Sequence, residues 1–259
     1  ALNGMTSSTS NSNYGKTGAI DFNNRRAMRS IYETEHRLLA TLRSKHYFFG
    51  ADKPTTFTLI FERKSGLPAY PTFDTFTSRT SDYKARAFGY DYNLNDDSSS
   101  LLYIPTRNDP LVCYSSGCGS EGSADALARE EAVLNLLYNV FGLEGKAGQI
   151  ADRGSMRFPW QSSLDFKVTQ ILPGFRGDDE FVITLGIENL LNLLDDDKGV
   201  IRYGYYSGRI PVIDLKIIDG SRYDYSRNAF RYSFDNPYNM SLSATQSVWR
   251  AQLGIKYNF

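Results

Sequence analysis

The sequence lacks any long hydrophobic run, and no stretch approaches the 18 or so apolar residues that a membrane-spanning helix requires. It also lacks an excess of charge of either sign, because 29 basic side chains balance 29 acidic ones. This balance argues against a nucleic-acid-binding protein, which would carry a basic excess or patch. Two classes stay open, a soluble all-β protein and a membrane β-barrel, since barrel strands alternate lipid-facing residues with polar ones.

Cysteine and histidine are scarce, with two of each. Cys113 and Cys118 lie in a polar Ser/Gly stretch, which predicts a small disulfide formed in an oxidising compartment; two unpaired thiols are the alternative. His36 and His46 share one face of a predicted strand but lie roughly 33 Å apart, so they cannot share a metal or catalytic centre. No HExxH, GxSxG or cysteine-metal spacing occurs, and the sequence therefore predicts no catalytic residue, no cofactor and no enzyme.

Tyrosine and phenylalanine are abundant instead, with 18 and 16 residues, and many of them lie in alternating segments. The alternation of apolar and polar residues predicts nine strands. These cover residues 35–49, 56–62, 84–92, 101–106, 160–171, 181–188, 201–205, 210–218 and 249–259. The last strand has the clearest pattern, and its predicted lipid-facing side chains are Trp249, Ala251, Leu253, Ile255, Tyr257 and Phe259. The other face carries Arg250, Gln252, Gly254, Lys256 and Asn258.

The longest region without predicted strands is 105–158, and it contains one predicted helix over 123–141. Ser123 is placed as the N-cap, Asp125 favours the helix dipole, and Gly142 ends the helix. The predicted apolar face comprises Leu127, Leu134, Leu137, Tyr138 and Phe141. A helix packed over its own loop is the simpler interpretation, and a binding lid is the alternative.

Three features favour a membrane barrel over a soluble sandwich. Several strands reach about ten residues, the length that crosses a bilayer at a tilt of about 45°. Aromatic residues such as Trp160 and Trp249 lie at the ends of apolar faces, as in interfacial girdles. Short connections at 50–53, 93–100 and 173–179 alternate with long ones at 65–83, 105–158 and 219–244. Outer-membrane barrels have short periplasmic turns and long external loops in this way.

The direction of each strand follows if Phe259 is placed on the periplasmic side. Counting back through nine strands then puts every short turn in the periplasm and every long loop outside, including the helix-containing loop at 105–158. Nine is an odd number, whereas bacterial single-chain barrels have even numbers of strands. An open sheet edge is not tolerated in lipid. We therefore expect residues 1–259 to be an all-β, antiparallel segment of about 8–10 strands from a larger transmembrane barrel.

Particular phrases resemble the late barrel strands of Oar-like TonB-dependent receptors, over roughly residues 33–259. The phrases, in family order, are EHRLLATLRSKHYFFG, TTFTLIFERKSGLPAYPTFD, LLYIPTRNDP, RFPWQSSLDFKVTQILPGF, FVITLGIENLLNLL and VWRAQLGIKYNF. The resemblance implies a barrel of about 22 strands with an N-terminal plug in its lumen. It also implies active ligand uptake energised by the TonB complex. The plug, the TonB-contacting segment and any further N-terminal domain have no counterpart in this sequence.

The resemblance implies a location in the bacterial outer membrane. The expected partners are membrane lipid, lipopolysaccharide, the barrel-assembly machinery, the TonB complex through the missing N-terminal part, and an unidentified ligand. The terminal strand ending in Phe259 looks like the general outer-membrane assembly signal. A passive porin-like or adhesive barrel without a plug is the alternative function, and the two differ in what precedes Ala1.

Two polar clusters complete the candidates. Asp195, Asp196 and Asp197 form an acidic run that suits Ca²⁺ or lipopolysaccharide-bound divalent ions, with a solvated loop as the default. An acidic pair of Asp165 and Glu188 across neighbouring strands is a weak catalytic candidate. A polar network along the lumen that includes Lys167 is the favoured interpretation. Tyr203, Tyr205 and Tyr206 suit a ligand path, and a girdle role fits at least the first two as well.

Overall fold

The computed structural model describes residues 29–30, 32–74, 101–204, 208–214, 216–218, 222–229 and 232–259. The chain divides into two compact units, each built from separated segments. The sheet unit comprises Thr34–Gly66, Pro159–Tyr203 and Ser241–Phe259, and the loop unit comprises Ala1–Glu33, Leu67–Phe158 and Gly204–Met240. Within the described residues, no helix combines the length and the apolar character needed to cross a membrane.

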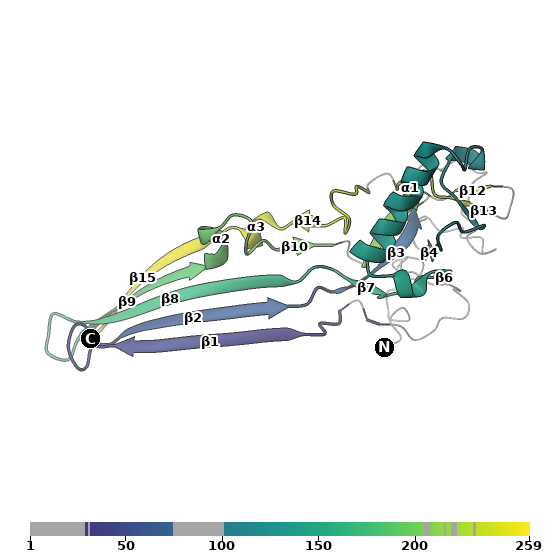
Figure 1. Ribbon diagram of the computed structural model, residues 1–259. Helices are drawn as coiled ribbons and strands as arrows, with labels where there is room; N and C mark the ends of the chain where they lie inside the picture. The colour runs from purple at the N-terminus through teal and green to yellow at the C-terminus, as the bar shows by residue number, and fades with distance from the viewer. Residues whose placement is uncertain are drawn as a thin grey trace, which may run out of the picture. The chain divides into compact units, whose positions relative to one another are not determined.

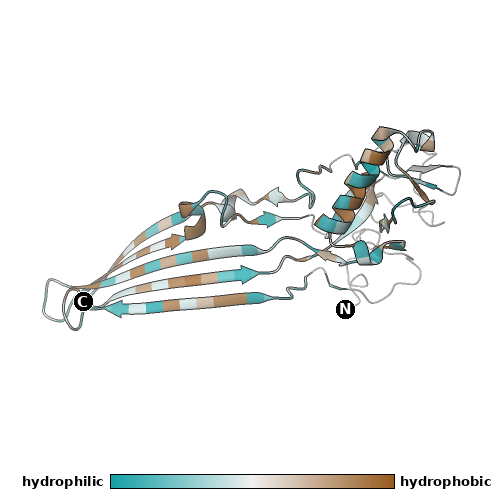
Figure 2. Ribbon diagram, viewed as in Figure 1, coloured by the Kyte–Doolittle hydropathy of each residue, from teal (hydrophilic) through white to brown (hydrophobic). Residues whose placement is uncertain are grey.

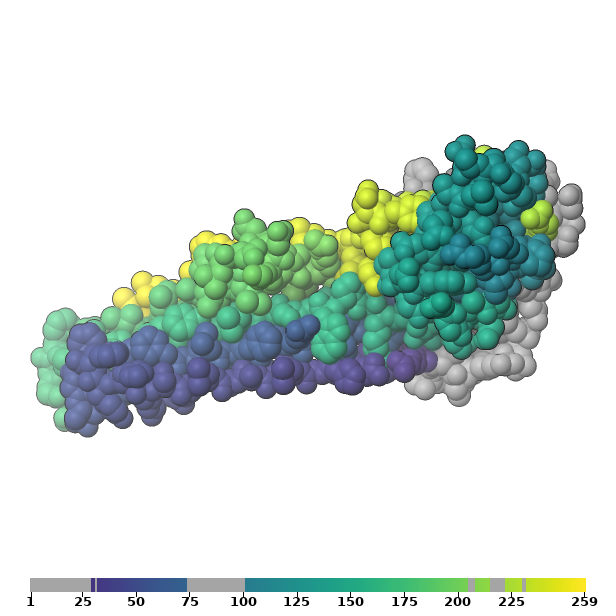
Figure 3. Space-filling model, viewed as in Figure 1, coloured from purple at the N-terminus to yellow at the C-terminus, as the bar shows by residue number. Residues whose placement is uncertain are grey.

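The sheet unit contains five long strands that pair antiparallel in chain order (Figure 1). They are β1 (Arg37–His46), β2 (Thr55–Lys64), β8 (Gln161–Pro173), β9 (Glu180–Glu188) and β15 (Arg250–Asn258). The side chains of β1 and β2 lie against one another along the strands (Figure 3). The predictions of strands at 35–49, 56–62, 160–171, 181–188 and 249–259 are confirmed.

Short and long connections leave this sheet at opposite ends. Residues 47–54 join β1 to β2, and residues 174–179 join β8 to β9, both at the end where β15 finishes (Figure 1). Residues 65–160 join β2 to β8, and residues 189–249 join β9 to β15, both from the other end. The short connections predicted at 50–53 and 173–179 therefore lie at the same end of the sheet.

The register gives the sheet two chemically different faces. One row across all five strands comprises Leu42, Leu59, Phe166, Ile187 and Ala251. The next row comprises Arg43, Thr58, Lys167, Gly186 and Gln252. We call these sides the apolar face and the polar face, and their alternation is visible along the strands in Figure 2. A slip of one residue would exchange the faces of a strand, so this pattern also fixes the register.

Three other predicted strands do not join the five-stranded sheet, so the count of nine long strands is wrong. From 101–106 only β4 (Tyr103–Ile104) forms, and it pairs with β6 (Gln149–Ile150). From 201–205 only β10 (Arg202–Tyr203) is described, and it pairs with β14 (Ser241–Leu242).

The segment 210–218 is the third exception. It divides into β11 (Arg209–Asp214), which pairs parallel with β3 (Pro68–Asp74), and β12 (Lys216–Ile218), which pairs with β13 (Arg222–Asp224). The physical reason for the error is burial on both faces: consecutive residues such as Val212 and Ile213 are fully buried. Such runs belong to a protein core rather than to a strand with one outer face. The predicted strand 84–92 and the turn 93–100 lie outside the described residues.

The loop unit has its own hydrophobic core, formed by the short strands and one helix. Its remaining elements are β5 (Val112–Cys113), η4 (Ser116–Cys118), η6 (Glu144–Lys146) and β7 (Met156–Arg157). Helix α1 (Ala124–Asn135) continues into a π-helical turn, η5 (Leu136–Val140). Fully buried core side chains include Leu102, Ile104, Leu137 and Ile210. The predicted helix is confirmed, together with packing of this helix onto its own unit.

The ends of this helix also agree with the sequence. The Ser123 hydroxyl accepts the Ala126 N–H at 3.2 Å, and Gly142 has a φ of +70°. The predicted apolar face is wrong at one position, because Leu127 is 55% exposed while Leu134 and Leu137 are buried. Ala126 takes the buried position in this first turn.

Candidate functional site

Large aliphatic side chains make up the apolar face of the sheet, and those on its outer strands are exposed. Leu38 and Leu42 on β1 are 56% and 66% exposed, and Leu253 and Ile255 on β15 are 66% and 67% exposed. Water-soluble proteins rarely leave contiguous apolar patches beyond a few hundred Å² uncovered, and larger ones mark a membrane or protein contact. This face is therefore the first candidate site.

Aromatic rings gather at the short-turn end of the apolar face. Phe181 and Tyr257, which pair across β9 and β15, have ring centroids 4.7 Å apart. Phe175 in the adjoining turn lies 5.2 Å from Phe181, and His46 on β1 lies 5.8 Å from Phe57. The register places Ala251, Leu253, Ile255 and Tyr257 on the face assigned from the sequence, and Trp249 and Phe259 lie just before and just after the paired residues.

A second aromatic group lies at the long-connection end. His36 stacks on Trp160 with centroids 6.2 Å apart, and the Arg63 guanidinium lies 5.3 Å from the same indole ring. His36 and His46 thus occupy opposite ends of β1, as predicted, and each contacts an aromatic ring. Rings with one polar edge are typical of the two interfaces of a membrane protein.

Two polar side chains on the apolar face, those of Thr55 and Gln170, are paired within the protein. Gln170 lies on this face in β8, opposite Thr55 in β2, whose hydroxyl donates to the Gln170 side-chain oxygen. The Gln170 amide donates to the carbonyl of Ile171 at 2.6 Å. Such pairing matters in an apolar medium, where an unpaired polar group costs several kcal/mol by order of magnitude.

The polar face carries a groove of about 460 Å³ across four strands. Gly186 on β9 and Gly254 on β15 form part of its floor, and their missing side chains leave the space. Lys167, Thr58, Thr184 and Gln252 border one part of the groove, and Asp165 and Glu188 border another. The groove thus brings Asp165, Glu188 and Lys167 to one place, and a polar network among them stays a prediction.

The two carboxylates of the groove have neighbours of their own. Asp165 Oδ1 accepts the backbone N–H of Asn189 at 2.9 Å. Glu188 faces Arg250 in the register of β9 and β15. A second hollow of about 440 Å³ adjoins both carboxylates and also borders Asn189 and Arg250.

Asn189 forms a junction at the end of β9 that sequence reasoning missed. It has a φ of +54°, and its side-chain amide donates to the carbonyls of Gly199 at 2.9 Å and Ser247 at 2.7 Å. Ser247 in turn accepts the Ile201 N–H at 2.9 Å. The junction therefore holds the short helices α2 (Leu190–Leu194) and α3 (Ala244–Ser247) together.

The acidic run beyond α2 is held by local contacts. Asp195 pairs with Lys198 at 2.9 Å and accepts the Asp197 N–H at 3.0 Å. The hydrogen bond from Lys198, followed by that from Asp197, holds the pKa of Asp195 below its ordinary value. Among the described residues, Asp195, Asp196 and Asp197 do not gather their oxygens into a metal-sized cluster. The cation site stays a prediction.

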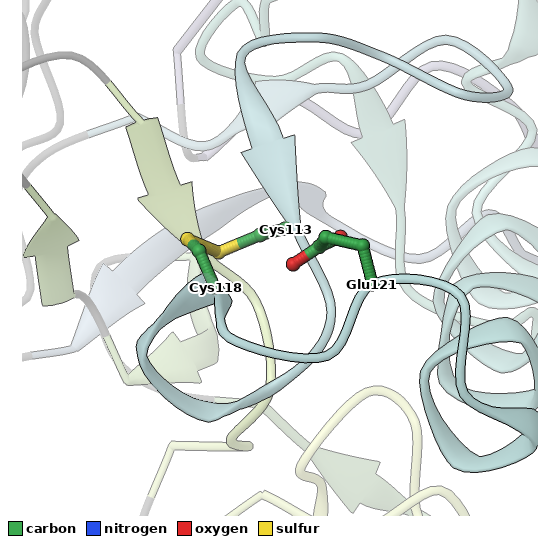
Figure 4. Close-up of side chains that lie close together, drawn as sticks. All are labelled: Cys113, Cys118 and Glu121. Atoms are coloured by element: carbon green, nitrogen blue, oxygen red, sulfur yellow. A yellow bond between two sulfur atoms is a disulfide. The ribbon is translucent and has the colours of Figure 1, made fainter.

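Cys113 and Cys118 are joined in a disulfide, with Cα atoms 5.4 Å apart (Figure 4). Glu121 lies beside them, and the possible ligand atoms of these three residues lie within 4.8 Å of one another. Metal binding by cysteine needs thiolates, which a disulfide does not offer. The Glu121 carboxylate instead accepts the Ser115 hydroxyl at 3.0 Å and lies 3.8 Å from Arg222, so this loop has a structural role.

Asp109 in the loop unit is a further buried carboxylate that the sequence did not single out. It accepts hydrogen bonds from the Tyr103 hydroxyl at 2.9 Å and from the N–H groups of Thr106 and Leu111 at 3.0 and 2.9 Å. Burial alone would raise the pKa of Asp109, but these hydrogen bonds outweigh it and lower the pKa. Burial, followed by the bond to Asp109, raises the pKa of Tyr103 to about 12. Asp109 and its hydrogen-bond donors therefore stabilise a turn and do not form a reactive centre.

Of the aromatic side chains predicted near residue 203, only Tyr203 can be placed: it is 58% exposed on β10. Positions 205 and 206 lie outside the described residues. A scan against protein-family models, a search of curated proteins and a search of solved structures each found no match to the chain.

Proposed function

We propose that the five-stranded sheet is a section of a bacterial outer-membrane β-barrel, with its apolar face toward lipid and its polar face toward an aqueous lumen. The short turns would lie in the periplasm, and the loop unit would lie outside the cell. The protein would be a TonB-dependent receptor of the Oar-like kind that takes up a ligand actively. This family assignment rests on the phrase resemblance alone.

One observation carries the barrel proposal: the apolar face is exposed on long, paired strands that end in aromatic rings. The five strands have 10, 10, 13, 9 and 9 residues. Transmembrane β-strands need about 9–11 residues at a tilt near 45°. The exposed leucine and isoleucine side chains of β1 and β15 would then contact hydrocarbon rather than water.

Two further features support this orientation. The disulfide between Cys113 and Cys118 belongs to the loop unit, and such bonds persist in oxidising compartments and at cell surfaces. The polar face carries charged side chains around an open groove, which suits a water-filled interior. Lipid, lipopolysaccharide and the barrel-assembly machinery would be the partners of the outer surface.

Cell fractionation tests the location. An epitope tag at Gly177, in a short turn with open space around it, is expected to sediment with outer membranes and to resist urea washing. External protease should leave this tag intact in whole cells and reach it only after the outer membrane is opened. Recovery of the protein in the soluble fraction would refute the proposal.

The alternative function is a passive porin-like or adhesive barrel, and the sequence upstream of Ala1 separates the two. A plug followed by the barrel would support active uptake, and uptake would then stop in cells that lack TonB. A complete reading frame without a plug would refute the receptor and leave the passive barrel.

A further inference from the structure

The polar face carries a band of basic side chains near the short-turn end. Arg43 and Lys167 lie in one row, and Lys45 lies in the next row toward the short turns. Among the described residues, no ion pair or hydrogen bond engages these three side chains. Their backbones are about 7–12 Å apart at ordinary strand spacings, so three long cationic side chains can reach one area.

Hydroxyl and amide groups fill the positions between these cations. Thr56, Thr58, Thr169 and Thr184 occupy the same two rows, and Gln252 ends the row of Lys167. No acidic side chain stands in either row on the five strands. Ammonium, guanidinium, hydroxyl and amide groups together present hydrogen-bond donors that match the oxygens of a polyvalent anion.

The groove supplies a concave place for such an anion. Its floor at Gly186 and Gly254 lies in these two rows, and Lys167 and Thr58 stand at its edge. The two carboxylates that border the groove, Asp165 and Glu188, stand in the row beyond Lys167, on the side away from Lys45. Asp165 accepts a backbone N–H, and Glu188 faces Arg250 in the register.

We infer that the part of the groove at Lys167, together with Arg43 and Lys45 on the edge strand β1 beside it, binds a polyvalent oxyanion of the phosphate class. If the polar face lines a lumen, as the proposed function requires, the site lies on the route of a solute through the barrel. The inference thus deepens the proposed function by naming the ligand chemistry: a small phosphate-bearing solute.

Titration of inorganic pyrophosphate into the full chain in maltoside micelles, followed by phosphorus NMR, tests the site. Lys167→Gln is expected to weaken binding about ten-fold, the effect of one charge-assisted hydrogen bond. Lys64→Gln is the matched control, since Lys64 lies on the same face in β2 but about 20 Å from Thr58 along the strand. At 0.1 M salt, where screening acts over about 10 Å, the control should change binding less than two-fold by this order-of-magnitude reasoning.

Circular dichroism of each variant verifies that the sheet has formed. Equal weakening in both variants, or no pyrophosphate binding at millimolar concentration, would overturn the inference. Flotation of the complete barrel protein that contains this chain with lipid vesicles separates the two proposals. Flotation without pyrophosphate binding refutes the anion site alone, whereas failure of the complete protein to float refutes the membrane barrel.

Discussion

Replacement of Leu253 by arginine perturbs the apolar face at its centre. Leu253 is the fourth of nine residues in β15, pairs with Leu185 and is 66% exposed. If that exposed surface meets hydrocarbon, arginine near the bilayer midplane costs about 2–4 kcal/mol. This cost corresponds to a folding equilibrium constant lowered roughly 30- to 800-fold.

The assay is reversible folding of the complete barrel protein that contains this chain into lipid vesicles as a function of urea concentration, with folded protein recognised by protease resistance. Gln252→Arg is the matched control, because Gln252 is the neighbouring residue on the polar face and borders the groove. We expect the control to change the midpoint little. Equal destabilisation by the two arginines would refute the assignment of the faces.

Three further predictions concern stability. Gly199→Ala places a Cβ against a buried asparagine oxygen, at a residue with a φ of +62°. We expect this change to destabilise the chain by about 1–3 kcal/mol in urea melts. Gly177→Ala is the control and should not destabilise it, because there is open space around Gly177. Asp109 has a lowered pKa, so its stabilising effect is complete above its ordinary pKa near 4 and is lost as pH falls through the lowered value. Asp109→Asn should therefore flatten the acid limb of the stability profile of the loop unit, and an unchanged limb would contradict the hydrogen-bond assignment. Reduction of the Cys113–Cys118 disulfide should destabilise this unit by about 2 kcal/mol, the loop-entropy value for a closed loop of this length, and an unchanged thermal midpoint would contradict it.

The long strands could be predicted from the sequence because each has one apolar face and one polar face along its whole length, which gives a regular alternation of residues. Every second side chain from Trp249 to Phe259 is apolar, and the register of β15 places those from Ala251 to Tyr257 on one face. The same logic failed at 210–218, where Ile210, Val212 and Ile213 are all buried. There both faces of the segment are buried in the protein. An apolar run of this kind predicts a buried segment, but it does not show which sheet the segment joins.

The candidate groove was only partly predictable. Asp165, Glu188 and Lys167 could be placed together because each belongs to a regular strand with a known side-chain parity. Asn189 could not, because its contacts reach Gly199 and Ser247, ten and 58 positions away, from a left-handed backbone conformation. Long-range hydrogen bonds of this kind leave no periodic signal in a sequence.

The contact of the apolar face with lipid can be measured directly by placing a single tryptophan on either side of β15. In a background with Trp160→Phe and Trp249→Phe, Ile255→Trp should be strongly quenched by phospholipids brominated on their acyl chains. Lys256→Trp, on the polar face, should be quenched by aqueous iodide instead and hardly by the brominated lipid. Equal quenching at the two positions, or the reverse pattern, would contradict a sheet with hydrocarbon on one side and water on the other.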